Sequence, residues 1–125
     1  MSLFYNSSMV EGVDSKWYAT VEQAKMKANK LINQVVAVNQ STSFVVGKLK
    51  EVEIDSLWQK KMPYCRLSLE KPQRFRDTGK FECALGDIEL FFVNKPGMIF
   101  TIDDLETIKP ELYREIRGRI KKGEL

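Results

Sequence analysis

Apolar and polar residues alternate most regularly over residues 64–70 of the chain. Cys65, Leu67 and Leu69 fall on one side of an extended backbone and the intervening polar residues fall on the other, which is the two-residue period of a half-buried β-strand. Shorter runs rich in β-branched and aromatic residues are also typical of strands. They predict further strands at residues 35–38, 44–54, 80–85, 88–92 and 98–101.

Near the N-terminus, apolar residues recur instead at the spacing of an amphipathic helix. Thr20 and Gln23 fit a capping box, in which each side chain satisfies an otherwise unpaired backbone amide of the first helical turn. This pattern predicts a helix over residues 21–33. Its inner stripe is Val21, Ala24, Ala28, Leu31 and Ile32.

A second helical pattern lies at the end of the chain. Thr101 or Asp103 can cap it, and Pro110 suits the first turn of a second helical piece. Gly123 is a typical helix terminator. The predicted inner stripe is Leu105, Ile108, Leu112, Ile116 and Ile120.

Turn-forming residues and shifts of the apolar phase predict where the strands bend. Residues 39–43 predict a hairpin turn. The phase slips around Gly47, which predicts a bulge or sharp bend that lets one strand serve two sides of a small barrel. Residues 71–80 combine proline, glycine and charged side chains, and they predict a loop.

Residues 80–92 leave two topologies open. After Gly86 the apolar phase resets to Ile88, Leu90 and Phe92, which fits either a tight hairpin or one strand with a glycine bulge. The whole pattern predicts an α+β fold: a bent antiparallel sheet or small β-barrel of five or six strands, with an N-terminal and a C-terminal helix. We expect a single domain over residues 1–125, in which residues 1–16 are an arm or a short edge strand.

The composition is that of an ordinary globular protein, with 43% hydrophobic residues, 30% charged residues and a formal net charge of +3. No apolar run approaches the roughly 18 residues of a membrane span, and residues 1–14 lack the apolar stretch of a secretion signal. We therefore expect an intracellular, cytoplasmic protein that does not enter a membrane. The isolated Cys65 and Cys83 are expected to be reduced residues of the core.

The chain contains no histidine, which excludes catalysis by Ser-His or Cys-His pairs and removes the usual zinc ligand. No phosphate-binding glycine motif occurs either. The remaining catalytic candidates are Glu51, Glu53 and Asp55 on one strand, and Asp103 and Asp104 at a helix start. A solvated strand face and helix capping explain both groups without catalysis, so we expect no enzymatic activity, no metal site and no cofactor.

A basic and aromatic stretch between residues 58 and 80 is the main candidate for a binding site. Its cations could neutralise phosphates while an aromatic ring stacks on an unpaired base. The candidate nucleic-acid-binding residues are Trp58, Lys60, Lys61, Arg66, Lys71, Arg74, Phe75, Arg76 and Lys80. Phe75 is expected at an exposed loop tip between two arginines. The alternative is that Trp58 closes the core and the cations only solubilise two loops.

Two other segments are candidates for binding, the first for nucleic acid and the second for a protein. Cations line the end of the C-terminal helix, where the helix dipole favours them without any ligand. Residues 1–18 are rich in apolar and aromatic side chains that suit a protein partner or self-association, or packing onto their own domain. The sequence thus predicts a non-enzymatic nucleic-acid-binding domain that prefers single-stranded DNA or RNA. The alternative is a protein–protein interaction module, an adaptor or inhibitor, with no small-molecule site.

Overall fold

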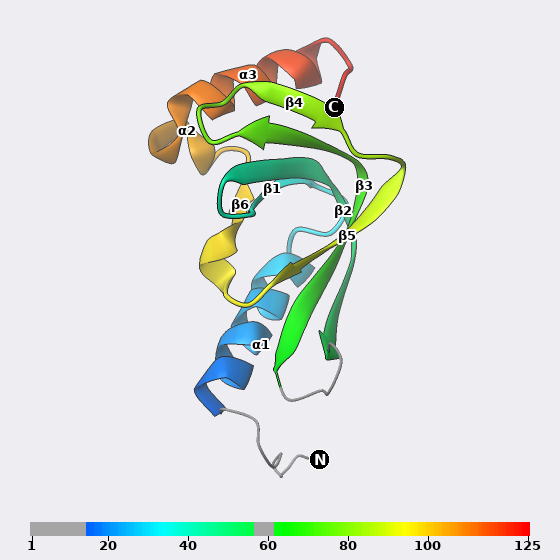
Figure 1. Ribbon diagram of the computed structural model, residues 1–125, viewed down its shortest axis with the longest axis vertical. Helices are drawn as coiled ribbons and strands as arrows, with labels where there is room; N and C mark the ends of the chain where they lie inside the picture. The colour runs from blue at the N-terminus through cyan, green and yellow to red at the C-terminus, as the bar shows by residue number, and fades with distance from the viewer. Residues whose placement is uncertain (1–14, 57–61) are drawn as a thin grey trace.

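The computed structural model describes residues 15–56 and 62–125, which form a bent antiparallel sheet with helices packed on it (Figure 1). In chain order the elements are α1 (Ser15–Asn29), β1 (Val35–Asn39), β2 (Ser43–Ser56), β3 (Pro63–Arg76), β4 (Phe81–Ala84), β5 (Ile88–Val93), the 3-10 helix η1 (Pro96–Met98), β6 (Ile99–Thr101), α2 (Leu105–Ile108) and α3 (Pro110–Lys121). In the view of Figure 1, α1 runs beside the lower part of the sheet and α3 lies across its upper end.

The six strands form one sheet in the order β4-β3-β2-β1-β6, and β5 also pairs with β3. β3 pairs with β5 through residues 65–70 and with β4 through residues 73–75. β2 occupies the other side of β3 over both stretches, so β4 and β5 lie along the same edge. The predicted α+β fold with a bent sheet is confirmed, and the sheet is open rather than closed into a barrel.

This pairing identifies Gly86 as a break within one edge strand. Because β4 and β5 follow the same side of β3, residues 81–93 form a single interrupted strand and not a hairpin. Gly86 has a φ of +111°, a left-handed conformation that glycine adopts without steric penalty. Just after the break, the Asp87 carbonyl accepts a hydrogen bond from the Lys71 amide at 2.6 Å, which ties the edge back to β3.

The sheet separates two hydrophobic cores. The core under α1 contains Val21, Ala24, Ala28, Val36, Val38, Val45, Leu49, Val52, Cys65, Leu67, Leu69, Val93 and Ile99. The core under α2 and α3 contains Ala37, Phe44, Val46, Phe75, Ile102, Leu105, Leu112 and Ile116. Successive residues of β1 alternate between the two cores, as the period of a strand requires. We call the two sides of the sheet the α1 face and the α3 face.

β2 bends where the sequence predicted. Its pairing with β3 shifts register twice between residues 46 and 51. Gly47 lies at the first shift, where an added Cβ would stand 3.1 Å from the Pro72 Cα. Glycine therefore allows the close approach of the two backbones, and the predicted bend is confirmed.

β3 continues through the segment that the sequence assigned to a loop. Residues 71–76 belong to the strand, and the connection to β4 is reduced to residues 77–80. Lys71 has a φ of +48°, and this local irregularity reverses which side chains face which core. Leu69 before it packs on the α1 face, whereas the odd-numbered Phe75 after it packs on the α3 face. The prediction of an exposed loop tip at Phe75 is wrong, because the side chain is 0% exposed.

α1 begins and ends earlier than predicted. It spans Ser15–Asn29 instead of residues 21–33, so Thr20 lies inside the helix. The Thr20 hydroxyl donates to the Lys16 carbonyl at 2.8 Å, and the predicted capping box is therefore wrong. The buried residues of α1 are Val21, Ala24 and Ala28, all from the predicted stripe. Residues 1–14, most of the predicted arm, lie outside the described residues.

The C-terminal helices follow the predicted signals. The Thr101 hydroxyl accepts from the Asp104 amide and the Asp104 carboxylate accepts from the Thr101 amide, both at 3.1 Å, which forms a reciprocal cap ahead of α2. Pro110 opens α3 as predicted. Ile108 departs from the predicted inner stripe, since it is 53% exposed at the end of α2. None of the described helices is both long and apolar enough to cross a bilayer.

The two free cysteines have different surroundings. Cys65 is buried in the core under α1, as predicted. Cys83 is exposed on β4, so the prediction that it faces the core is wrong. The physical reason is that β4 is an edge strand paired beyond the irregularity at Lys71, where the α1 core no longer covers the residue opposite Arg74.

Candidate functional site

The predicted basic stretch is divided between different parts of the molecule. Trp58, Lys60 and Lys61 lie outside the described residues. The described members are Arg66, Lys71, Arg74, Phe75, Arg76 and Lys80. Four of these are charged residues of β3, and the strand spreads them along its length and over both of its faces.

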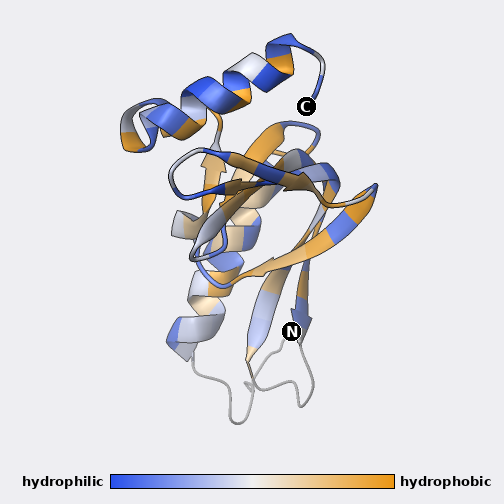
Figure 2. Ribbon diagram, turned by 45° about the horizontal axis from the view of Figure 1, so that its top comes forward, coloured by the Kyte–Doolittle hydropathy of each residue, from blue (hydrophilic) through white to orange (hydrophobic). Residues whose placement is uncertain are grey.

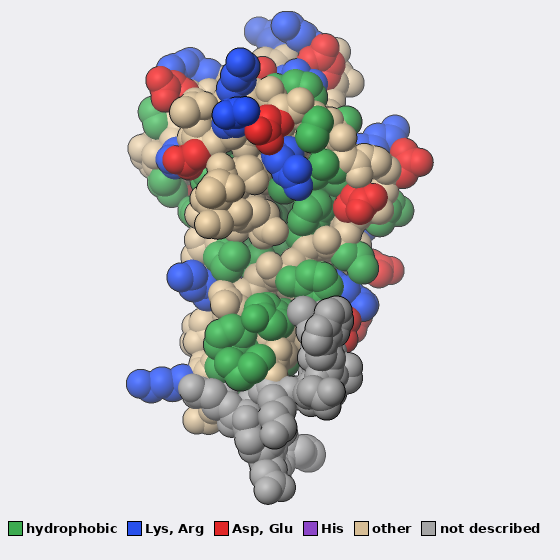
Figure 3. Space-filling model, viewed as in Figure 1, with side chains coloured by type: hydrophobic (Ala, Val, Ile, Leu, Met, Phe, Trp, Pro, Cys, Tyr) green, Lys and Arg blue, Asp and Glu red, His purple; other side chains and the backbone are tan. Residues whose placement is uncertain are grey.

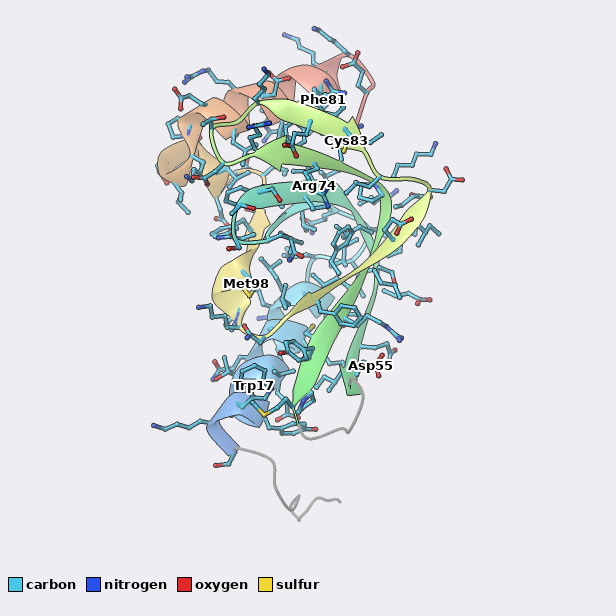
Figure 4. The ribbon with its side chains drawn as sticks, in the orientation of Figure 1. Trp17, Asp55, Arg74, Phe81, Cys83 and Met98 are labelled. Atoms are coloured by element: carbon cyan, nitrogen blue, oxygen red, sulfur yellow. The ribbon has the colours of Figure 1, made fainter. Side chains whose placement is uncertain are left out.

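Arg66 and Arg74 lie near opposite ends of β3. The Arg66 guanidinium donates to the Asp55 carboxylate of β2 at 2.9 Å. Figure 4 places Asp55 at the lower end of the sheet and Arg74 at the upper end. The reversal at Lys71 also puts the two arginines on opposite faces, with Arg66 on the α3 face beside Phe92 of β5. They do not contribute to one surface.

Arg74 and Arg76 share the α1 face at the upper end of β3, and Lys80 is exposed in the turn to β4. Arg76 is engaged, because its Nε lies 3.1 Å from the Glu82 carboxylate. Within the described part of the chain, the Arg74 guanidinium has no hydrogen-bond or ion-pair partner. On the face drawn in Figure 3, Lys and Arg side chains are interspersed with Asp and Glu over this end of the molecule, and no continuous cationic surface forms there.

The aromatic ring that was expected to stack on a base is instead part of the core under α3. Phe75 packs edge to face on Phe81 of β4, with ring centroids 5.7 Å apart and planes at 71°. The guanidinium of Arg119 in α3 lies 3.8 Å from the Phe81 ring centroid. The Arg119 Nε also donates to the Gln73 side chain at 2.9 Å. These contacts hold α3 onto β3 and β4 and leave Phe75 inaccessible to a ligand.

Several of the carboxylates considered for catalysis have structural partners. Asp55 pairs with Arg66, and Asp103 pairs with Arg117 of α3. Asp104 caps α2. Among residues 15–56 and 62–125, no group of three or more Cys, Asp or Glu side chains is placed to hold a metal ion.

The outer side of β5 is an unpaired sheet edge. β5 pairs with β3 on one side, and no strand in the described ranges pairs with its other side. Ile88 is 59% exposed and Leu90 is 50% exposed, and the alternation of the strand places both on the α3 face, which α3 does not cover here. Figure 2 shows β5 as a mainly hydrophobic strand at the margin of the sheet.

Sequence reasoning missed this edge because its apolar period resembles that of a buried strand. The alternate apolar residues from Ile88 to Phe92 repeat like a core stripe, but Phe91 and Val93 are the residues of β5 that reach the core under α1. A signal in the sequence was the charge distribution: residues 81–93 contain acidic residues and no Lys or Arg, although the whole chain has a formal charge of +3. The acidic residues are Glu82, Asp87 and Glu89.

The α1 face of the same edge is acidic. Glu89 is paired across the ladder with Leu69 of the α1 core, which places Glu89 on the α1 face, and Asp87 lies just before the first residue of β5. Neither carboxylate has an ion-pair or hydrogen-bond partner among the described residues. The Glu89 carboxylate lies over Gly86, 2.9 Å from where a Cβ would stand. The edge therefore presents apolar side chains on the α3 face and the unpaired Glu89 carboxylate on the α1 face, with Asp87 exposed just before the strand.

A hollow of about 470 Å³ adjoins the end of the apolar stripe where β4 meets β5. Its lining includes Pro72, Ala84, Gly86 and Leu125. The chain end is held at this place by the Gln73 side-chain amide, which donates to the Glu124 carbonyl. The hollow lies next to the free edge and is bordered by Asp87.

We call the exposed part of β5 together with this hollow the β5 edge. It combines an unpaired backbone, exposed apolar side chains and unpaired charge, which no other described strand does. Comparisons of the chain with family models, with curated proteins and with solved structures find no match, so the function is inferred from this geometry.

Proposed function

We propose that this domain is a non-catalytic protein-interaction module that takes an extended segment of a partner protein as an added strand along β5. The observation that carries the proposal is the unpaired side of β5, with Ile88 and Leu90 each at least half exposed. Strand addition satisfies the free backbone groups of such an edge and gives alternate side chains of the ligand a surface to pack on.

An exposed apolar edge is a liability in a protein that acts alone. Monomeric proteins protect their sheet edges with short strands, bulges, charges or covering elements, because a bare edge pairs with other chains. The upper part of this edge has such protection, since β4 is only four residues long and is followed by the break at Gly86. β5 has acidic residues but also two exposed apolar ones, and a partner strand would cover them.

The expected affinity is modest. Full burial of an Ile or Leu side chain is worth about 1.5–3 kcal/mol, so covering the exposed half of Ile88 and of Leu90 gives about 1.5–3 kcal/mol together. Each backbone hydrogen bond of the added strand contributes about 0.5–1.5 kcal/mol. After the cost of ordering the ligand, these gains correspond to a Kd on the order of 0.1–1 mM for a short peptide.

A displayed library of random nine-residue peptides tests the proposal. We expect selection on the wild-type domain to enrich extended peptides that shift the backbone amide NMR signals of β5. The double variant I88K/L90K should lose their binding, because it puts charge on the apolar face of the edge. The matched control M26K/I108K adds the same charge at two exposed apolar positions on α1 and α2, and it should bind as the wild type does.

The proposal fails if the enriched peptides bind I88K/L90K as tightly as they bind M26K/I108K. It also fails if the peptides perturb the amides of α1 or α3 and leave those of β5 unchanged. Because both variants alter exposed residues, their melting temperatures should match that of the wild type within about 2 °C, which separates lost binding from lost folding.

Nucleic-acid binding is the second candidate, and Arg74 is the observation that favours it. Its guanidinium lacks a partner among the described residues and lies on the same face as Arg76. Fluorescence anisotropy with labelled dT20 and U20 oligonucleotides provides the test. Binding by phosphate neutralisation would weaken steeply between 50 and 200 mM salt and would be lost in R74A/R76A but not in the control K121A/K122A. Absence of binding at 50 mM salt would refute it.

A further inference from the structure

We infer that the segment recognised by the β5 edge alternates apolar and basic residues, so that each class of side chain meets a different face of the strand. The inference rests on the proposed function and specifies the chemistry of the partner. It follows from the two faces of β5, which present different chemistry at successive residues.

The apolar side chains of the ligand belong on the α3 face. Ile88, Leu90 and Phe92 lie there at alternate positions, and each forms the outer end of a row that crosses the sheet through β3. A strand added beside β5 places a side chain directly opposite each of them, with Cβ atoms about 4.5–5.5 Å apart. Aliphatic or aromatic residues at those positions extend the rows by one member and cover the exposed surface.

The basic side chains belong on the α1 face. Glu89 lies on that face and Asp87 lies just before the strand, and neither carboxylate has a partner in the described ranges. Lys or Arg side chains next to these carboxylates form pairs of opposite charge, which are favourable, whereas acidic side chains there are destabilising. The exposed position of both carboxylates keeps these pairs sensitive to salt.

The hollow beside Gly86 offers a further contact at the start of β5. Gly86 lies just before β5 and presents no side chain, and the hollow lies beside it. A ligand residue opposite Gly86 can therefore lean across the backbone into the hollow of about 470 Å³ lined by Pro72 and Leu125. A large apolar side chain there would fix the register of the added strand.

Charge also argues against a second copy of the same strand as the occupant. Two β5 strands paired in antiparallel orientation would bring Glu89 and Asp87 of one copy close to the same residues of the other. Like charges in opposite positions are destabilising, and each edge segment of residues 81–93 carries three acids with no base to offset them. A basic partner segment removes this repulsion.

Three capped octapeptides test the inference by titration followed through backbone amide NMR. The first alternates valine and lysine, the second alternates valine and glutamate, and the third has four valines followed by four lysines. The alternating valine–lysine peptide should bind at β5, and the other two should bind at least tenfold more weakly. The blocked peptide has the same charge and composition as the first, so it reports non-specific attraction.

Replacing the two carboxylates with amides tests the preference for basic residues separately from strand addition itself. The isosteric variant D87N/E89Q should raise the Kd of the alternating valine–lysine peptide about 3- to 10-fold, as expected for the loss of two exposed charge pairs. The control E106Q/E111Q removes two exposed acids on α2 and α3 and should leave the affinity unchanged. I88K/L90K should abolish binding.

The outcomes are distinct. If D87N/E89Q binds the valine–lysine peptide as the wild type does, or if the valine–glutamate peptide binds equally well at β5, the preference for alternating apolar and basic residues is refuted. Strand addition along β5 would still stand. If I88K/L90K binds the valine–lysine peptide as the wild type does, both this preference and the proposed function are refuted. If labelled dT20 displaces the peptide from β5 with equal or greater affinity, the edge recognises nucleic acid rather than a strand with basic side chains, and the inference is refuted.

Discussion

Replacing Phe75 with alanine should strongly destabilise the domain. The side chain is fully buried between β3 and α3 and packs on Phe81. Truncating a buried Phe to Ala costs about 3–5 kcal/mol, from lost burial and from the cavity that remains. For a chain of 125 residues with about 2.1 cal/mol/K of unfolding entropy per residue, this cost lowers the Tm by about 11–19 °C.

Thermal melts followed by circular dichroism measure the effect directly. I108A is the matched control, because Ile108 is 53% exposed and its truncation should shift the Tm by no more than about 2 °C. If F75A does not fold at all, the milder F75L should melt about 4–6 °C below the wild type, as for a loss of about 1–1.5 kcal/mol. An F75A variant that melts within 3 °C of the wild type would refute the burial of Phe75 and restore the exposed ring expected from the sequence.

Two further predictions concern glycine and cysteine. G79A should lose about 1–3 kcal/mol, because Gly79 has a φ of +99° and a Cβ would stand 2.9 Å from the Leu112 amide nitrogen. G118A should gain about 0.5–1 kcal/mol of unfolding free energy, since Gly118 lies in α3 with nothing within 4 Å of its Cβ position. Urea titrations of both variants measure these changes. Ellman's reagent at pH 8 should modify the exposed Cys83 promptly and Cys65 only after unfolding, because burial raises the pKa of the Cys65 thiol to about 11. The unfolded Cys65 thiol ionises near its ordinary pKa of 9.0, so the stabilisation from burying the neutral thiol should be intact below pH 9 and lost as pH rises toward 11. C65A should lack this pH dependence of stability. Equal reactivity of both thiols in the folded protein would contradict the argument.

The sequence predicted the strands well where the alternation was uninterrupted. Residues 64–70 follow a strict period, and Cys65, Leu67 and Leu69 are all buried as expected. The period could not predict what happens at Lys71, because a positive φ at a non-glycine residue leaves no compositional signal. Residues 71–76 were therefore assigned to a loop, and the buried Phe75 was assigned to its exposed tip.

The helix start shows a different limit. Thr20 and Gln23 have the residue types of a capping box, but a threonine inside a helix can satisfy its hydroxyl by donating to the carbonyl four residues earlier. The Lys16 carbonyl accepts this bond at 2.8 Å. The same residue types thus fit two positions in a helix, and tertiary packing of the preceding turn decided between them, since Trp17 donates to the Pro63 carbonyl at 2.6 Å.

The candidate site was the least predictable part. Basic residues that are close in sequence were expected to converge, but a strand of 14 residues carries them along its length and its two faces separate them. The β5 edge could not be recognised from its apolar period alone, because the period is the same whether a core or a partner covers the stripe. Only pairing shows which strand is left at an edge.

The two cores on either side of the sheet have a consequence for dissecting this protein. Val36 and Val38 of β1 belong to one core and Ala37 between them belongs to the other, so the same strand contributes side chains to both cores. A fragment that ends before α2 would leave Phe44 and Phe75 in water, although every contact of α1 could in principle persist. Neither half can be excised as a minimal unit, and shortened versions made to map binding should keep the chain through α3.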